Sequence, residues 1–397
     1  MKFLFITSRN VVNTCGELRL IKNRAKCLSE KYGFTGDFLV YRNDLCSQKP
    51  MEEIGEEFTL QQFLYPKNKI CSMKKQAKLL TEEVLSKLQK DSYDVVILSG
   101  NMVLFLAKLI KKKFPNKKIV IDVHGAIEEL KEFKGKSFKE KLIRKLAYGI
   151  MRRQEKKYMK HADAFFAVSV ALKKYLIDNY GLKNKEFFIV PCSQKQQVLD
   201  VETKKSNRVK YRQKYNISEN EKLFIYSGGL SPWQCVEESV VLFKKVAQSV
   251  PNCKMILFTG DQRAIEKYQS DNIMVDSLPF NLVNDVICAG DYAFMLRGDY
   301  VTNHVAYPNK FIEYVCSGMK VITTPFVKDV ATQIMDHEIG IVLEEIKEDS
   351  LIEYVKNSKS YMDDVESRQK LLDDVCFENR LKPFFDFVND KDLSCNE

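Results

Sequence analysis

The chain has 397 residues, more than a single hydrophobic core usually holds, so its length predicts two domains. Hydrophobic residues make up 45% of it, as in an ordinary globular protein, and no apolar run reaches the ~18 residues of a membrane-spanning helix. The net charge of +10 favours an anionic partner, which leaves nucleic acid, a phospholipid surface and a phosphorylated substrate as candidates.

The first residues, MKFLFITSRN, turn polar too soon for a signal peptide and instead predict a buried strand. The 11 cysteines are scattered and include no CxxC pair, which favours reduced thiols in the core over disulfides or a metal site. Together these features predict a cytoplasmic protein without a bound metal.

Short apolar runs alternate with helical patterns through the first half of the chain. The runs are rich in β-branched and aromatic residues and lie at 2–8, 94–99, 118–125 and 164–169. Helical patterns follow at 18–33 and 170–181. The alternation predicts βαβ units around a parallel sheet, and thus an α/β domain that we place at 1–197.

Two loops at the ends of these predicted strands are candidate sites. In the loop at 8–17, Gly16 allows the backbone to approach a phosphate or an acceptor closely. His124 ends the third apolar run, where a histidine can donate to a sugar hydroxyl or stabilise developing charge. The alternative for His124 is a purely structural role.

Residues 131–160 form a basic stretch with twelve Lys or Arg against three Glu. The stretch favours an anionic partner such as a phospholipid surface or a phosphorylated substrate. The alternative is a solvated helix face. No nucleic-acid site is predicted, because too few aromatic residues lie among the charges to stack on bases.

The alternation pauses at 194–221, a polar, lysine-rich stretch that predicts a linker and an exposed helix. It then resumes, with predicted strands at 222–229, 254–260, 273–277, 292–297, 320–324 and 340–343 and helical patterns at 236–250, 263–270, 280–290 and 310–318. We therefore predict a second domain at 198–375, so that two doubly wound parallel sheets face each other across a cleft. The Phe-rich segment 376–397 predicts a terminal helix that packs back on the first domain.

Gly228 and Gly229 follow the first predicted strand of the second domain, in the sequence YSGGLSPWQ. They allow a tight turn and close approach to a ligand, beside a predicted helix start that can bind phosphate. The spacing is not GxGxxG, so no dinucleotide site is predicted. Trp233 either stacks on a base or sugar or covers the core, and an ordinary turn is the alternative for the whole segment.

A later strand–loop–helix segment places charged residues where an α/β sheet opens toward a ligand. Arg297 ends an apolar run and Lys310 lies in the first turn of the next helical pattern, and both suit a pyrophosphate. Glu313 lies one turn past Lys310 on the same face, where its carboxylate can accept hydrogen bonds from a ribose diol. Asn303 and His304 lie in the intervening loop and can line a sugar pocket. The alternative is a set of surface ion pairs.

The sequence LRGDYVTNHVAYPNKFIEYVCSGMKVI resembles the donor-site signature of bacterial glycosyltransferases with the GT-B fold, specifically glycosyltransferase family 4. Its most specific part runs from Pro308 and Asn309 to Gly318. The segments DVHG, ADAFFAVSVALKKYL, FIVPCS and YSGGLSPWQ agree in order, so the resemblance covers nearly the whole chain. It implies two Rossmann-like domains, of which the first binds the acceptor and the second the nucleotide sugar.

The resemblance also implies roles for individual residues. Glu313 would hold the nucleotide ribose, and Lys310 and Arg297 would face the donor phosphates. His124 would lie beside the donor sugar, and Gly16 would lie near the diphosphate.

Two positions depart from the family pattern. Val305 stands where many members have a glutamate that touches the donor sugar, and the sequence GGLSPWQC lacks the Arg and Lys that often bind the diphosphate. Both contacts must then come from elsewhere, and Arg297 with Lys310 are the predicted source. The donor sugar itself is not predicted.

The implied donor is a uridine diphosphate sugar, with no tightly bound cofactor and no metal, because cationic side chains can stabilise the leaving diphosphate. The sugar would pass with retention of configuration to a glycan or polyprenyl-diphosphate-linked acceptor in bacterial cell-surface polysaccharide synthesis, and domain closure would exclude water. The protein would be cytoplasmic, with peripheral contact to the inner face of the membrane through residues 131–160.

Three other functions stay open. A nucleotide-sugar 2-epimerase of the same fold would change a sugar nucleotide without an acceptor. A non-catalytic subunit is suggested by Val305 and the missing bases, and a nucleic-acid-binding protein by the net charge. No HExxH, GxSxG or P-loop pattern is present, so zinc hydrolysis, serine esterase chemistry and Walker-type ATP hydrolysis are not predicted.

Overall fold

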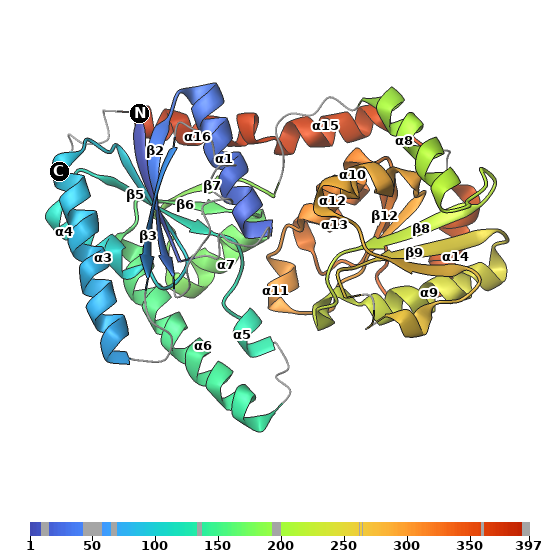
Figure 1. The fold of residues 1–397 in the computed structure, drawn as a ribbon, viewed down its shortest axis with the longest axis horizontal. Coiled ribbons are helices and arrows are strands. Elements are labelled where there is room, and N and C mark those ends of the chain that lie inside the picture. Colours follow the sequence, from blue (N-terminus) through green and yellow to red (C-terminus); the bar gives the residue numbers. More distant parts are fainter. Residues whose placement is uncertain are drawn as a thin grey trace. The chain divides into compact units, whose positions relative to one another are not determined.

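The computed structural model describes residues 1–8, 16–42, 58–64, 70–132, 137–192, 200–261, 263, 265–358 and 361–390 (Figure 1). The chain folds into two compact units, and the first and last parts of the sequence share one of them. Unit 1 comprises Met1–Gln196 and Val375–Glu397, and unit 2 comprises Gln197–Asp374. Each unit is built on one parallel sheet.

Unit 1 has a seven-stranded sheet with the order β3-β2-β1-β4-β5-β6-β7. The direction of winding reverses between β1 and β4, and ligands of doubly wound sheets bind at the carboxyl ends of strands beside such a reversal. The strands are β1 (Lys2–Thr7), β2 (Thr35–Arg42), β3 (Phe58–Leu64), β4 (Val95–Ser99), β5 (Lys118–Val123), β6 (Ala164–Ala167) and β7 (Glu186–Ile189).

The helices of unit 1 include one from the far end of the sequence. They are α1 (Gly16–Tyr32), α3 (Ile70–Lys90), α4 (Phe105–Lys113), α5 (Glu129–Glu132), α6 (Phe138–Tyr158), the 3-10 turn η1 (Met159–His161), α7 (Val170–Tyr180) and α16 (Phe377–Asn389). Helix α16 lies beside α1 (Figure 1). The centre of its Phe384 ring lies 6.3 Å from the ring centre of Phe34 and 5.5 Å from that of Phe188. The last helix therefore completes the core of the first unit.

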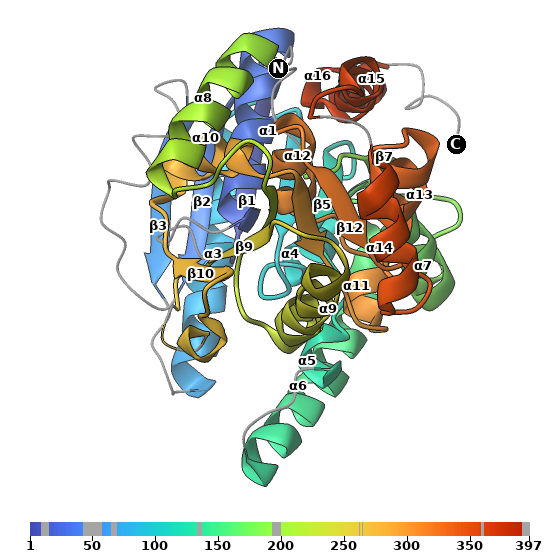
Figure 2. The same cartoon turned by 90° about the vertical axis from the view of Figure 1, so that its right-hand side faces the viewer.

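Unit 2 has a six-stranded sheet with the order β10-β9-β8-β11-β12-β13. Its strands are β8 (Lys222–Ser227), β9 (Cys253–Phe258), β10 (Ile273–Asp276), β11 (Tyr292–Met295), β12 (Lys320–Thr323) and β13 (Gly340–Val342). Its helices and 3-10 turns are α8 (Val201–Lys214), η2 (Pro232–Gln234), α9 (Val236–Ser249), η4 (Glu266–Tyr268), η5 (Phe280–Leu282), α10 (Val283–Val286), η6 (Ile287–Ala289), α11 (Val301–His304), α12 (Asn309–Cys316), α13 (Lys328–Asp336), α14 (Glu348–Asn357) and α15 (Val365–Val375). Figure 2 shows α9 and α14 side by side, joined by an ion pair of 2.9 Å between Lys245 and Glu348.

The structure confirms all ten strands that the apolar runs predict, and adds three. The additional strands are β2, β3 and β7, of which β3 and β7 form the two edges of the unit 1 sheet. The pattern at 263–270 predicts a helix, whereas the described residues of this range include the short turn η4 and no α-helix, and 280–290 is divided among η5, α10 and η6. No disulfide joins any of the cysteines that the structure describes.

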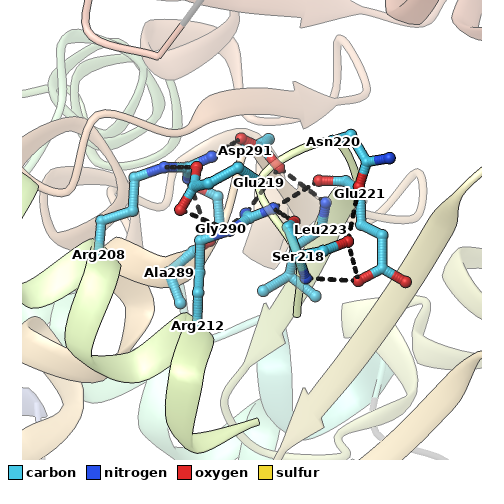
Figure 3. A network of polar contacts seen from close by, with 10 residues as sticks. All are labelled: Arg208, Arg212, Ser218, Glu219, Asn220, Glu221, Leu223, Ala289, Gly290 and Asp291. Atoms are coloured by element: carbon cyan, nitrogen blue, oxygen red, sulfur yellow. Dashed lines mark hydrogen bonds and ion pairs between the residues drawn. The ribbon is translucent and has the colours of Figure 1, made fainter. Parts of the chain in front are cut away.

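Helix α8 exposes one face, as its polar composition suggested, and two buried arginines on its other face fix it to the amino ends of the unit 2 strands (Figure 3). Arg208 Nη2 donates to Asp291 Oδ1 at 2.6 Å. Arg212 Nη2 donates to the carbonyl oxygens of Ser218 and Glu221 at 2.5 and 2.6 Å. Burial lowers the pKa of Arg212, and the carbonyls and Asp291 compensate its charge. The spacing of four residues places both arginines on one helix face.

Candidate active site

The predicted residues of unit 2 gather where β8 and β11 end and α12 begins. Tyr314 of α12 ties the end of β8 in place, because Ser227 N donates to the Tyr314 hydroxyl at 2.9 Å and that hydroxyl lies 3.3 Å from the Ser227 carbonyl oxygen. Thr324 holds the backbone of Arg297 in place, because the Arg297 backbone N–H donates to Thr324 Oγ1 at 3.1 Å. The geometry of the site is thus fixed by buried side chains behind it.

Three donors converge on the side-chain oxygen of Gln234. Lys310 Nζ donates to Gln234 Oε1 at 2.7 Å, Tyr226 Oη at 3.0 Å and Arg297 Nη1 at 3.3 Å. Lys310 Nζ also lies 4.4 Å from the centre of the Tyr226 ring. One neutral amide oxygen therefore accepts from two cations and a phenol.

The two cations are poorly compensated. Arg297 is only 5% exposed, and burial lowers its pKa. Burial, with the nearby Arg297 charge, holds the pKa of Lys310 well below its usual range. Within the described parts of the chain, neither side chain forms an ion pair with a carboxylate. Buried charges normally have a counter-charge, so this pair favours binding of an anion.

Gly228 leaves the space that Lys310 occupies. Its φ of +143° lies in the range that favours glycine, and a Cβ built on it would lie 2.7 Å from Lys310 Nζ. At Gly229 the nearest atom to such a Cβ is Gln234 Nε2, at an ordinary 3.5 Å. Only the first glycine of the pair is therefore required by the packing.

Helix α12 carries the other donor-motif residues. Pro308 is its N-cap in extended conformation, Asn309 is its first residue, and Glu313 lies half-buried one turn past Lys310. Gly318 follows the helix with a φ of +78°. The predicted helix between a proline and a glycine is confirmed.

Asn303 and His304 lie in the short helix α11 and not in a loop, as the sequence suggested. Asn303 is buried, and its Nδ2 donates to the carbonyls of Gly298 at 2.8 Å and Trp233 at 3.3 Å. His304 Nε2 lies 2.8 Å from Asp299 Oδ1. Asn303 thus ties η2 to the segment after β11, while the half-buried Trp233 contributes its backbone oxygen to this link.

Val305 is buried in the core at the position where a sugar-binding glutamate was expected from the family pattern. An apolar side chain packed there cannot make a polar contact to a sugar.

The predicted residues of unit 1 form a separate set. Gly16 is the first residue of α1. His124 lies just after β5, and its Nε2 lies 2.8 Å from Asp122 Oδ2. Arg24 of α1 completes the group, because its Nη1 donates to Asp122 Oδ1 at 2.5 Å and its Nη2 to the Val190 carbonyl at 2.5 Å.

Charge compensation keeps Asp122 ionised. Burial alone would raise its pKa, but Arg24 and His124 outweigh burial and hold the pKa below the usual range of an aspartate. The histidine is thereby oriented by a buried carboxylate, an arrangement common where imidazole takes part in binding or proton transfer.

Gln234 is the residue of these two groups that the sequence analysis missed. It is neutral and lies where the family pattern has a base, so a search for charge does not find it. Arg24, near the loop at 8–17, and Asp122, in the DVHG segment, lie in stretches that the sequence does single out, but only the fold shows that the two side chains pair.

In the described parts of the chain, no group of three or more His, Cys, Asp and Glu is arranged to hold a metal ion. None of the described helices is both long and apolar enough to cross a membrane.

Comparison with known proteins gives one family match. Residues 44–193 match the model of Glycosyltransferase Family 4. No curated protein shows significant similarity to the chain.

Solved structures of similar fold match both units together. HepE from Anabaena, solved in complex with UDP, has a TM-score of 0.68 at 13% identity, over 98% of this chain and 99% of that one. WaaG, a glycosyltransferase involved in lipopolysaccharide biosynthesis, has a TM-score of 0.66 at 17% identity, over 98% and 100%. The lipopolysaccharide outer core galactosyltransferase WaaB has a TM-score of 0.68 at 14% identity, over 98% and 100%. At these identities the likeness shows a shared fold and confirms the predicted architecture of two Rossmann-like domains.

Proposed function

We propose that the chain is a glycosyltransferase of the GT-B fold, resembling glycosyltransferase family 4, and that it uses a uridine diphosphate sugar as donor. The observation that carries the proposal is the convergence of Arg297 and Lys310 on Gln234 Oε1. A diphosphate oxygen would replace the amide oxygen and bring a negative charge into direct hydrogen-bond contact with both cations. Uridine is proposed because HepE, similar in fold, was solved with UDP.

Each residue of the unit 2 site then has a role. Arg297 and Lys310 stabilise the charge that develops on the leaving diphosphate, which is the main electrostatic task in glycosyl transfer. Glu313 accepts hydrogen bonds from the ribose hydroxyls. Gly228 keeps the space for the Lys310 ammonium. No metal is required by this arrangement, and we propose that the reaction proceeds without one.

In this proposal unit 1 binds the acceptor, and His124 lies near the sugar that is transferred. The acceptor is a glycan or a polyprenyl-diphosphate-linked sugar of cell-surface polysaccharide synthesis, as suggested by the lipopolysaccharide enzymes WaaG and WaaB. We propose retention of configuration on the family resemblance and name no protein nucleophile.

Helix α6 is proposed as a membrane contact at the inner face of the cell membrane. Its N-terminal half extends away from the sheet of unit 1 (Figures 1 and 2). There it exposes a row of apolar side chains between lysines, namely Phe138, Leu142, Ile143, Leu146 and Ile150. Phe138 is 84% exposed. Apolar side chains flanked by basic ones suit the interface of an anionic bilayer.

Thermal unfolding with nucleotides tests the donor site. We expect UDP to raise the unfolding midpoint of the wild type, and Lys310→Ala and Glu313→Ala to remove most of the increase. A charge-assisted hydrogen bond contributes about 1.5–3 kcal/mol, so each loss should weaken UDP binding at least tenfold. Lys245→Ala, on the exposed face of α9, is the matched control and should bind UDP as the wild type does.

If no nucleotide raises the midpoint of the wild type, the donor-site proposal fails. Incubation with a UDP-sugar and no acceptor separates transfer from epimerisation, because only an epimerase would convert the sugar under those conditions.

A further inference from the structure

A cavity of about 330 Å³ opens in unit 1 at the carboxyl ends of β1, β4 and β5. Asn101, His124 and Glu155 contribute polar atoms to its lining, and Met151 and Met159 contribute apolar surface. The cavity lies beside the reversal of the sheet, where doubly wound domains bind ligands.

His124 presents an unpartnered ring nitrogen to this cavity. Its Nε2 lies 2.8 Å from Asp122 Oδ2. The other ring nitrogen, Nδ1, is buried, and no described residue provides a hydrogen-bond partner for it. A buried polar atom without a partner favours a ligand that supplies one, and a hydroxyl group can both donate and accept.

Glu155 is a second buried group that no step proposed so far uses. It lies on the part of α6 that packs against the body of unit 1, and its carboxyl accepts a hydrogen bond from the Tyr180 hydroxyl. Asn101 also hydrogen-bonds to this carboxyl. Burial raises the pKa of Glu155, and the nearby Glu128 adds to the effect. Two neighbours thus hold the carboxyl in a fixed orientation at the cavity wall.

The charge of the lining restricts the ligand. Among the described lining residues, Asp122, Glu129 and Glu155 are acidic, and none is Lys or Arg. A phosphate offers mainly acceptors and negative charge, so it would face repulsion and unmatched acceptors here. A sugar ring offers hydroxyl donors for the polar side and C–H surface for the two methionines.

We propose that this cavity binds a neutral, hydroxyl-bearing ring of the acceptor, whose hydroxyls form hydrogen bonds with Glu155 and His124 Nδ1. The inference rests on the proposed function, in which unit 1 binds the acceptor. The diphosphate of a lipid-linked acceptor then lies outside the cavity. Glu155 is a recognition residue in this scheme.

Saturation-transfer NMR on the full chain tests the proposal, with UDP present to occupy the donor site. The probes are methyl glycosides of glucose, galactose and N-acetylglucosamine, and inorganic pyrophosphate is followed by its phosphorus signal. We expect at least one glycoside to bind the wild type and pyrophosphate not to bind. Glu155→Gln should weaken the glycoside about tenfold, as expected for loss of a hydrogen bond to a charged group.

Two controls make the outcomes distinct. Glu186→Gln removes an exposed carboxylate of β7 and should leave glycoside binding unchanged. His124→Asn provides a second variant at the same cavity, and the circular dichroism spectrum and unfolding transitions without ligand report that each variant is folded. If UDP binds but no glycoside does, if Glu155→Gln binds the glycoside as the wild type does, or if pyrophosphate binds in a His124-dependent way, the cavity proposal is wrong. If UDP does not bind the wild type, the proposed function itself fails.

Discussion

At the scale of single residues, two adjacent glycines make a matched test of the unit 2 site. Gly228→Ala introduces a Cβ 2.7 Å from Lys310 Nζ at a φ of +143°, so it displaces the ammonium and strains the backbone by about 1–3 kcal/mol. Gly229→Ala meets only an ordinary contact at 3.5 Å. We expect the first variant to weaken UDP binding about tenfold or more and the second to change it little, measured by calorimetric titration.

Equal losses in the two variants would contradict this assignment, because they would show that the turn as a whole, and not the space for Lys310, determines binding. A circular dichroism spectrum and an unfolding midpoint for each variant separate loss of binding from loss of fold.

Some residues of this site could be predicted from the sequence because their side chains are charged. Arg297 and Lys310 carry charge after an apolar run and in a first helical turn, and the structure brings them to one acceptor atom. That acceptor, Gln234, is neutral and follows the unrelated signal of Trp233. Asn303 shows the opposite case, since a polar residue expected in a sugar pocket is instead buried and used to tie two backbone segments together.

At the scale of elements, the two halves of α6 have different surroundings. Its C-terminal part places Glu155 at a cavity, while its N-terminal half exposes apolar side chains between lysines. If that half lies in a bilayer interface, each apolar side chain that leaves water contributes up to ~1.5–3 kcal/mol. We expect the double variant Phe138→Ser/Leu146→Ser to lose at least tenfold in vesicle binding, measured by flotation with phosphatidylcholine vesicles that contain phosphatidylglycerol.

The matched controls are Val209→Ser and Val241→Ser, exposed apolar positions on α8 and α9 that should leave flotation unchanged. Flotation of the wild type that does not depend on phosphatidylglycerol, or no flotation at all, would rule out the membrane contact.

In unit 1 the two edge strands were missed and four of the five inner strands were predicted, whereas in unit 2 the edge strands β10 and β13 were predicted as well. Central strands such as β4 are buried along their whole length, so they form continuous apolar runs. The edge strands β3 and β7 are short or interrupted by polar residues. β2 was missed for another reason. Its Asp37 interrupts the apolar run, and only the structure reveals that Tyr93 and Lys2 compensate this buried carboxylate.

At the scale of the whole molecule, unit 1 is built from two segments of the sequence that are separated by unit 2. Helix α16 comes last in the chain, yet its Phe384 packs against Phe34, Phe166 and Phe188 of the first unit. The first unit therefore needs the last segment of the chain to complete its core, while unit 2 lies between them in the sequence. Each unit nevertheless has its own sheet and its own core, which predicts that they respond separately to core mutations and to ligands.

This separation can be measured with one core variant in each unit. Phe384→Ala and Phe243→Ala each remove a fully buried ring, from unit 1 and unit 2 respectively, and each should destabilise its own unit by about 3–5 kcal/mol. UDP at one hundred times its dissociation constant stabilises the unit that binds it by ~2.7 kcal/mol. Since Arg297 and Lys310 both lie in unit 2, we expect UDP to raise the first calorimetric transition of Phe243→Ala and to leave that of Phe384→Ala unchanged. A first transition that shifts equally in both variants would contradict this expectation. It would mean either that the two units unfold as one cooperative body, which contradicts their separate response, or that UDP contacts both units, which contradicts a donor site held by unit 2 alone.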